Sequence, residues 1–438
     1  MPAAAREEEA ARLSGLCVQP RLALAELEGA IRDGLMAFSC ATGLLVIAEM
    51  MEAERTEIVG PKGRHDRGRA AERNGSAPGS VVLGSRTVPV SRPRVVAVGG
   101  GEIALDSYQV FSSTDLLTQV ALERMLAGVA TRRHGLVGEP IGETLEDVAR
   151  GVSKSAVSRR FKTATEAKLA ELLARDLSGL DVGAMMIDGV YFAGCCCVVA
   201  LAVTADGTKV PVGVWEGDTE NTTVVKDLLA DLVARGLACT DGVLFVLDGS
   251  KALAAGVNKV FGERAVIQRC TLHKRRNVAD YLPKGYAESI DAQLARAFND
   301  LDAKRGLRVA QGIAAQLEEH YPSAAASLRE GLDDMFTVRR LGASDTLARS
   351  LCCTNAVESM ISVVATLCDR VTNWKDHKMV RRWVGVGMLE AQRSFRRIKG
   401  CKEMPALVKA VRAEVARRRA PQATPKAAST PKAQRAVA

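Results

Sequence analysis

The order of the apolar segments between residues 184 and 267 restricts the fold more than any other feature of this chain. Apolar residues at every second position predict strands, and a period of about 3.6 residues predicts helices. In order, the predicted elements are three strands at 184–192, 195–204 and 209–215, a helix at 221–236, a strand at 243–247, a helix at 252–261 and a strand at 265–267. This order predicts an α/β fold in which an antiparallel meander precedes parallel strands joined by helices.

That arrangement is typical of a ribonuclease H-like core, in which the first and fourth strands lie side by side. Asp188 lies in the first predicted strand and Asp248 follows the fourth, so this fold brings the two aspartates together. A third carboxylate, Glu358, stands near the start of a helix-like segment further along. A lone aspartate at a strand end is usually a turn or cap residue, but three carboxylates in this strand order indicate a shared site.

The three carboxylates meet the needs of divalent-metal catalysis. Mg²⁺ prefers hard carboxylate oxygens and keeps several waters, so three carboxylates suffice. Two such ions activate a water or a 3′-hydroxyl and stabilise the leaving oxygen of a phosphodiester. We expect Asp188, Asp248 and Glu358 to be catalytic and to bind two Mg²⁺ or Mn²⁺ ions. Three rival ligands lie just past the third strand, away from the expected centre, and we interpret them as supporting or structural: Glu216, Asp218 and Glu220.

Residues 268–277 form a second dense motif, Gln-Arg-Cys-Thr-Leu-His-Lys-Arg-Arg-Asn. Cys270 and His273 are spaced like zinc ligands, but no second pair completes a tetrahedral site, so structural zinc is not expected. We interpret Cys270, His273 and Arg269 as supporting residues that pack the next segment onto the core, with His273 hydrogen-bonded near the active site. The basic residues of the motif either contact phosphates or form a solvated helix face: Arg269, Lys274, Arg275 and Arg276.

The charge balance favours a polyanionic partner. The chain has 60 Lys and Arg against 51 Asp and Glu, a net charge of +9, although this excess is also ordinary for a globular protein. Aromatic residues make up 4% of the chain, too few for a module that stacks single-stranded bases on rings. Double-stranded DNA is therefore the expected partner.

Residues 144–161 have the pattern of a helix-turn-helix. Gly151 breaks one helix, Ser153 can cap the next, and Val157 and Phe161 share one apolar face. The opposite face is basic and rich in hydroxyls, which suits the major groove of DNA, and carries Lys154, Ser155, Ser158, Arg159 and Arg160. An ordinary helical hairpin is the alternative.

Composition divides the whole chain into seven regions. The expected domains are an N-terminal helical region (1–60), a basic linker with a small β element (61–110), a helical DNA-binding region with the helix-turn-helix (111–180), the ribonuclease H-like core (181–273), a helical insertion (274–350), an acidic helix completing the core with basic C-terminal helices (351–419), and a disordered basic tail (420–438). The insertion is too long for a loop and has a helix-favouring composition.

The cysteines and the apolar runs bear on cellular location. Eleven cysteines, three of them adjacent at Cys195–Cys197, do not form a spaced disulfide framework, and we interpret them as reduced, buried residues. No apolar run approaches the roughly 20 residues of a membrane span. We expect a cytoplasmic protein associated with the bacterial nucleoid.

Several motifs of this chain occur together in one known family. They are Asp188-Gly-Val-Tyr191, Gly213-Val-Trp-Glu-Gly-Asp-Thr-Glu-Asn221, Leu247-Asp-Gly-Ser-Lys-Ala-Leu253, Gln268-Arg-Cys-Thr-Leu-His273 and Thr354-Asn-Ala-Val-Glu-Ser-Met360, with Arg73-Asn-Gly75, Pro93-Arg94 and Gly128-Val-Ala-Thr-Arg132 nearer the N-terminus. This set resembles the mutator-type transposases of bacterial insertion sequences, relatives of plant mutator elements. The resemblance covers most of residues 20–410. It implies a ribonuclease H-like core with a helical insertion, an acidic triad of the DDE type that binds metal, and a supporting Cys-His motif.

One departure from that family concerns the segment after Glu358. Relatives usually carry Arg or Lys one or two turns later, whereas here the first basic residue is Arg370. This departure predicts either weaker positioning of DNA or the use of Arg370 in place of the missing basic residue.

The sequence thus predicts a DNA transposase that binds the terminal inverted repeats of an insertion sequence and joins their cleaved strands to target DNA. Two ends must be joined, so a homo-oligomer on DNA is expected. The chain lacks the G-x-x-x-x-G-K-[ST] phosphate loop, so no ATP is expected. The alternatives are a ribonuclease H-like structure-specific nuclease, a DNA-binding regulator with an inert triad, and a decayed transposase.

Overall fold

The computed structural model describes residues 34–64, 68–138, 141 and 143–420. Residues 1–33 of the predicted N-terminal helical region, residues 65–67 of the predicted basic linker and residues 421–438 of the predicted tail lie outside the described residues. The chain divides into two compact units whose boundary follows Ala167, and each unit is described by itself.

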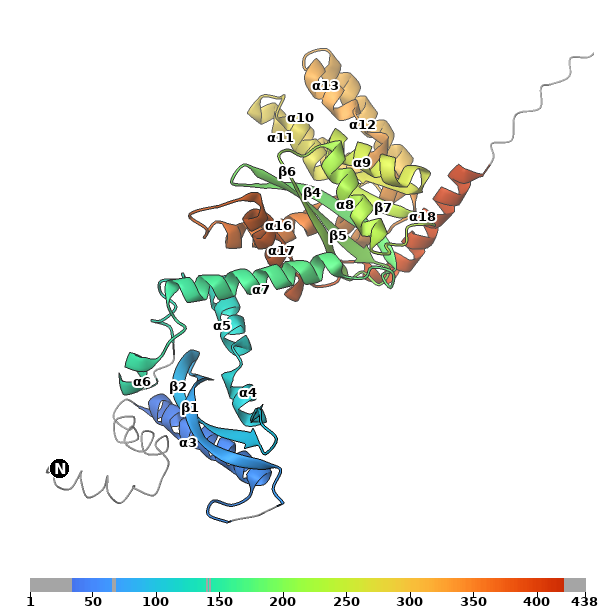
Figure 1. The fold of residues 1–438 in the computed structure, drawn as a ribbon. Coiled ribbons are helices and arrows are strands. Elements are labelled where there is room, and N and C mark those ends of the chain that lie inside the picture. Colours follow the sequence, from blue (N-terminus) through green and yellow to red (C-terminus); the bar gives the residue numbers. More distant parts are fainter. Residues whose placement is uncertain (1–33, 65–67, 139–140, 142, 421–438) are drawn as a thin grey trace, which may run out of the picture. The chain divides into compact units, whose positions relative to one another are not determined.

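The first unit combines a small sheet with helices (Figure 1). Its elements are α3 (Leu35–Val59), β1 (Ala71–Leu83), β2 (Arg86–Ala97), β3 (Glu102–Ile103), α4 (Asp106–Ser112), α5 (Asp115–Leu126), α6 (Glu143–Val148) and most of α7 (Lys154–Ala174). The strand order is β1-β2-β3, with antiparallel pairs. Apolar residues of α3, such as Leu44, Ile47 and Met51, share a core with Val81 and Val88 of the sheet.

The basic linker was predicted to run from Gly60 to Gly79, and this is wrong from Ala71 onward because β1 begins there. Arg73 of this strand is held on α3, where its guanidinium donates to Glu52 Oε1 at 2.5 Å and to Thr56 Oγ1 at 2.8 Å. The Gly- and Arg-rich composition hid this strand, which pairs with β2 and contacts α3.

Two helices, α6 and α7, occupy the region of the predicted helix-turn-helix. Gly151 separates them with a φ of +94°, and Ser153 Oγ accepts a hydrogen bond from the Ala156 N–H at 3.3 Å. Val157 and Phe161 are buried, as predicted. The outward residues Lys154, Ser155, Ser158 and Arg159 are exposed, whereas Arg160 is half-buried and donates to the Gly151 carbonyl. The helices are thus present, and their binding to DNA stays a prediction.

The second unit is built on a five-stranded mixed sheet. Its strands are β4 (Val182–Phe192), β5 (Cys195–Thr204), β6 (Lys209–Gly217), β7 (Val243–Leu247) and β8 (Ala265–Arg269), in the order β6-β5-β4-β7-β8. The first three strands form the predicted antiparallel meander, and β4, β7 and β8 are parallel to one another. The predicted α/β class and the predicted pairing of the first and fourth strands are confirmed.

Helices cover both faces of this sheet (Figure 1). Helices α8 (Thr222–Ala234) and α9 (Lys251–Phe261) pack on one face through a core that includes Leu228, Val257 and Phe245. Helices α16 (Asn355–Cys368) and α17 (His377–Arg393) pack on the other face, against β4, β5 and β6. The last helix, α18 (Met404–Arg419), contacts the amino-terminal ends of the central strands, where Val408 and Met404 approach Gly183.

The predicted insertion is helical and has its own core. After the short turn η2 (Gly262–Arg264) and β8 it contains α10 (Thr271–Ala279), α11 (Lys284–Phe298), α12 (Ala303–Glu318), α13 (Pro322–Arg329), η3 (Asp333–Phe336), α14 (Thr337–Arg340) and α15 (Asp345–Leu351). Apolar residues such as Leu294, Ile313 and Phe336 form this separate cluster. The chain then returns to the sheet with α16 and ends with α17, η4 (Cys401–Glu403) and α18.

The described cysteines are free thiols, and Cys195–Cys197 are fully buried in β5, as predicted. In the described part of the chain, no single helix has the length and apolar character to cross a membrane. Helices α15 and α16, which meet at a bend, have that length and apolar character only when the two are taken together.

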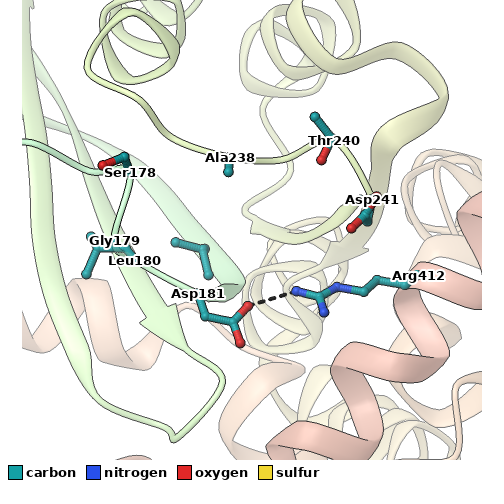
Figure 2. A pocket seen from close by; sticks show the side chains of 10 residues that line it. Ser178, Gly179, Leu180, Asp181, Ala238, Thr240, Asp241 and Arg412 are labelled. Atoms are coloured by element: carbon teal, nitrogen blue, oxygen red, sulfur yellow. Dashed lines mark hydrogen bonds and ion pairs between the residues drawn. The ribbon is translucent and has the colours of Figure 1, made fainter.

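A cavity of about 270 Å³ lies where β4 and β7 begin, at the far end of these strands from Asp188 and Asp248. Figure 2 shows the residues that line this cavity. Asp181, just before β4, and Arg412 of α18 form an ion pair of 2.8 Å there. Asp241 and Thr240 line the same cavity. The ion pair joins the C-terminal helix to the sheet.

Candidate metal site

The two predicted aspartates lie next to each other on neighbouring strands. Ile187 of β4 pairs with Leu247 of β7 in the parallel ladder, and each aspartate is the next residue along. Backbone N–H groups hold one oxygen of each: Gly189 donates to Asp188 Oδ1 at 2.9 Å, and Ser250 donates to Asp248 Oδ1 at 2.8 Å. Both side chains are half-buried.

The pKa of Asp188 reports how crowded this site is. Burial raises the pKa, and the neighbouring charge of Asp248 raises it further, to about 7. Glu358 adds to this effect, whereas the Gly189 N–H and the charge of His273 oppose it. Asp188 thus interacts with both of the other predicted carboxylates.

Glu358 reaches the site from the first turn of α16. This amino-terminal turn stabilises a carboxylate, because the positive end of the helix dipole lies there. Thr354, four residues earlier, donates from Oγ1 to Glu358 Oε1 at 2.5 Å, and His273 Nδ1 lies 3.9 Å from the same oxygen. The structure therefore brings the three predicted catalytic residues together from β4, β7 and α16.

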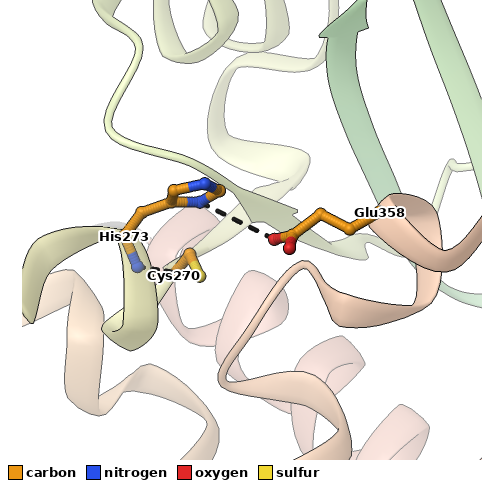
Figure 3. A group of neighbouring side chains, drawn as sticks. All are labelled: Cys270, His273 and Glu358. Carbon is orange, nitrogen blue, oxygen red and sulfur yellow. Dashed lines mark hydrogen bonds and ion pairs between the residues drawn. The ribbon is translucent and has the colours of Figure 1, made fainter. Parts of the chain in front are cut away.

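Cys270 and His273 lie beside Glu358 (Figure 3). The Cys270 N–H donates to the Leu247 carbonyl at 2.7 Å, so the start of α10 is tied to the end of β7. Cys270 Sγ accepts from the His273 N–H at 3.5 Å and caps the helix. The predicted role of His273, hydrogen bonding near the carboxylates, fits its 3.3 Å contact from Nδ1 to Thr354 Oγ1.

The Cys-His pair has shifted pKa values. Burial alone would raise the pKa of the Cys270 thiol, but hydrogen bonds with His273 and Thr354 hold it below its usual value. The hydrogen bond with Cys270 raises the pKa of His273 to about 9 against the effect of burial, and Glu358 and Asp248 add to the rise. His273 therefore carries a positive charge beside Glu358 at neutral pH.

Arg269 supports the loop after β7. Its guanidinium donates to the Gly249 carbonyl at 2.8 Å and to the Glu330 carbonyl at 3.0 Å. Gly249 lies between Asp248 and Ser250, so Arg269 joins the aspartate loop to the insertion. The predicted supporting position of Arg269 matches these contacts.

Two of the three remaining basic residues of this motif are occupied inside the protein. Lys274 is 3% exposed and its Nζ donates to the backbone carbonyls of Ser327 and Glu330, so the expectation that it contacts a phosphate is corrected. Burial also lowers the pKa of Lys274 to about 8. Arg275 makes a two-pronged ion pair with Asp291. Arg276 is exposed, and it alone of these three keeps an outward position.

The rival carboxylates divide by position. Glu216 pairs with Arg381 at 3.8 Å, and Asp218 is exposed. Glu220 contacts residues next to both aspartates. Its Oε1 accepts a hydrogen bond from Ser250 Oγ, and its Oε2 lies so close to Gly189 that a β-carbon at that position would overlap it. Burial and then Asp248 raise the pKa of Glu220.

Two contributors, Ser250 and Thr354, were not recognised as site residues from the sequence. Ser250 stands two residues after Asp248, and Thr354 stands one helical turn before Glu358. Hydroxyl residues at these spacings from a carboxylate are the signal by which they can be found.

The donor set fits a hard divalent cation. Each aspartate uses Oδ1 for a backbone N–H, and within the described residues no group donates to either Oδ2. Burial and then the charges of Asp248 and Glu358 raise the pKa of Asp188, so the three carboxylates repel one another unless a cation or protons neutralise them. Carboxylate oxygens with open lone pairs are the ligands of Mg²⁺ and Mn²⁺.

Comparison with known proteins agrees with the motifs. A family model described as Transposase, Mutator family, matches residues 25–397. The transposase for insertion sequence element IS6120 of Mycolicibacterium smegmatis is 28% identical over 286 residues, which cover 63% of this chain and 86% of that protein. The transposase for element IST2 of Acidithiobacillus ferrooxidans is 28% identical over 202 residues, 46% of this chain and 66% of that protein. The transposase for element ISRM5 of Rhizobium meliloti (strain 1021) is 26% identical over 313 residues, 68% of this chain and 73% of that protein.

Proposed function

The chain belongs to the mutator family of transposases, and on this premise we propose that it is a metal-dependent DNA transposase with Asp188, Asp248 and Glu358 as its catalytic residues. The observation that carries the proposal is the convergence of these carboxylates from β4, β7 and α16 at one end of the mixed sheet. The strand order and the flanking helices support a ribonuclease H-like core.

Asp188, Asp248 and Glu358 would hold two Mg²⁺ or Mn²⁺ ions. When bound, such ions supply activation of a water or 3′-hydroxyl and stabilisation of the leaving oxygen. The protein holds the ligands in place: the Gly189 and Ser250 N–H groups fix one oxygen of each aspartate, and Thr354 fixes Glu358. His273 lies close enough to balance part of the negative charge.

The proposed DNA partners are the terminal inverted repeats of the element and a target duplex. Exposed Lys154, Ser155, Ser158 and Arg159 on α7 support binding to the repeats, and exposed Arg276 on α10 supports a phosphate contact near the carboxylates. Two ends must react together, so we include a homo-oligomer on DNA in the proposal. No ATP is required by this chemistry, and the reaction would take place at the nucleoid.

The test is an incubation of the full chain with Mg²⁺ or Mn²⁺ and labelled DNA that carries the terminal repeats flanking its gene. We expect nicked strands and strands joined to a target. Asp248→Ala should abolish both products. Asp241→Asn, an exposed aspartate before the other end of the same strand, is the matched control and should keep them.

The other functions correspond to other outcomes of this assay. Cutting without joining would identify a structure-specific nuclease. Repeat binding without cleavage under either metal would identify a DNA-binding regulator or a decayed transposase. Products that persist in Asp248→Ala would reject the assignment of the carboxylates.

A further inference from the structure

The site contains a ligand type that hard-metal catalysis does not use. Cys270 Sγ, a ring nitrogen of His273 and a carboxylate oxygen of Glu358 all lie within 4.8 Å of one another (Figure 3). Mg²⁺ and Mn²⁺ favour oxygen ligands, whereas sulfur and imidazole favour Zn²⁺. The proposed function assigns a metal to only one of these three groups, Glu358.

We propose that Cys270, His273 and Glu358 form a second metal site, selective for Zn²⁺ or a similar thiophilic ion, which withdraws Glu358 from the catalytic ions. The inhibitory part of this proposal rests on the proposed function, but the metal site itself does not. One thiolate and one carboxylate balance the two charges of Zn²⁺, and three protein ligands leave a fourth position for water. Binding would release two protons to solvent, the thiol proton of Cys270 and a ring proton of His273, because only a thiolate and a neutral imidazole can coordinate the ion.

One oxygen atom, Thr354 Oγ1, lies within hydrogen-bond distance of all three ligands. It is 3.4 Å from Cys270 Sγ, 3.3 Å from His273 Nδ1 and 2.5 Å from Glu358 Oε1. Rotation of this small side chain would free the centre for an ion. Ligand bonds of about 2.0–2.3 Å then require each ligand to move inward by a modest amount.

The surroundings favour a cation at this point. Asp188 and Asp248 interact electrostatically with His273, and Cys270 is 2% exposed, so few waters compete for the ligands. The ligands come from two rigid helices: Cys270 caps α10, His273 lies in its first turn, and Glu358 lies in the first turn of α16. The site would therefore link the insertion to the helix that completes the carboxylate cluster.

Cobalt binding tests the metal site without DNA or activity. The full-length protein is stripped of metal and titrated with Co²⁺ while the thiolate-to-cobalt charge-transfer band is recorded. We expect one equivalent to produce the band and Zn²⁺ to remove it, because Zn²⁺ binds such sites more tightly than Co²⁺. No band in the wild-type protein would overturn the proposal.

Variants of the cysteines and of His273 identify the residues that bind the cobalt ion. Cys270→Ser removes the thiolate but keeps a side chain that caps helices well, so the fold should survive while the band disappears. Cys239→Ser, an equally buried thiol outside the cluster, is the matched control and should keep it. His273→Gln should weaken Co²⁺ affinity at least tenfold. A band that persists in Cys270→Ser would reject the site, and a wild-type affinity in His273→Gln would also reject it.

Strand-joining assays distinguish the proposed zinc site from the proposed transposase function. If strand joining occurs with Mg²⁺, added Zn²⁺ should lower it at least tenfold, and a chelator that binds Zn²⁺ but not Mg²⁺ should restore it. A cobalt band in a protein that never joins DNA would keep the metal site and overturn the transposase. Joining that is insensitive to Zn²⁺ at concentrations that saturate the site would overturn the competition for Glu358.

Discussion

Asp188 and Asp248 occupy equivalent positions on adjacent parallel strands, each one residue beyond the paired residues Ile187 and Leu247. A parallel ladder in register places the two carboxylates at the same level of the sheet, so their repulsion follows from strand pairing. Burial, and then this repulsion by Asp248, raises the pKa of Asp188.

Asp188→Asn should abolish strand joining while leaving repeat binding within about twofold of the wild-type affinity. Asparagine keeps the size of the side chain and the acceptor for the Gly189 N–H, but it removes a charged metal ligand. Joining and gel-shift assays on the same protein preparation check this. Joining at the wild-type rate would show that Asp188 is not a metal ligand.

The metal-free protein should lose stability as the pH rises from about 4 to about 7. Asp188 has an ordinary pKa of 3.8 when unfolded and about 7 in the native protein, so the native state holds an extra proton across this window. That stabilisation is complete below the lower value and is lost as the pH passes the upper one. Thermal unfolding in a chelator at pH 5 and pH 8 measures it.

Asp188→Asn should flatten that pH dependence. A gain of at least 1 kcal/mol at pH 8 would raise the melting temperature by about 2–4 °C. Added Mg²⁺ should raise the melting temperature of the wild-type protein at pH 8 and have less effect on the variant. Parallel pH profiles for the two proteins would contradict the raised pKa.

Glu220→Gln should weaken catalysis by about 10- to 100-fold, the usual cost of losing a group that orients a metal ligand. Glu220 holds Ser250 Oγ, and the Ser250 N–H holds Asp248. Because the variant acts through ligand position, higher Mg²⁺ should recover part of the rate. Asp218→Asn, an exposed neighbour, should have no effect. A loss that Mg²⁺ does not relieve would argue for a different role.

Lys274 and Arg276 should differ in what their removal changes. Arg276→Ala should reduce the slope of log affinity against log salt by about 0.9, the value for one lost phosphate contact. Lys274→Ala should leave that slope unchanged and destabilise the fold by about 1 kcal/mol, because the half-buried Ser327 carbonyl loses its side-chain donor and the Glu330 carbonyl loses one of two. Salt titrations and denaturant unfolding of both variants distinguish the two roles.

The sequence predicted the five strands of the second unit and helices α8 and α9 to within two residues at each end. β5 and β7 begin and end at the predicted residues, because turn residues bound their apolar runs on both sides. α7 extends well past Phe161 to Ala174, since its pattern continues without a stop signal. Residues 71–79 of β1 were missed because their Gly-, Arg- and Pro-containing composition predicts a linker.

The same limit applies to the site. Strand order was enough to bring Asp188 and Asp248 together. Whether Lys274 points inward depends on where α13 packs, and no local pattern in α10 contains that information. The contact between Cys270 and Thr354 joins residues on either side of the insertion, so it becomes visible only in the folded chain.

The insertion between β8 and α16 also sets when the site can form. During synthesis the ribosome releases the entire first unit, the whole sheet and both aspartates before it reaches Glu358. A chain that ends between β8 and Glu358, because it is still being synthesised or because of a stop codon or frameshift, therefore carries α6 and α7 but only two of the three carboxylates. If those helices bind the terminal repeats as proposed, such a fragment would occupy the ends without cutting them, and incomplete translation would produce a competitor of the intact protein.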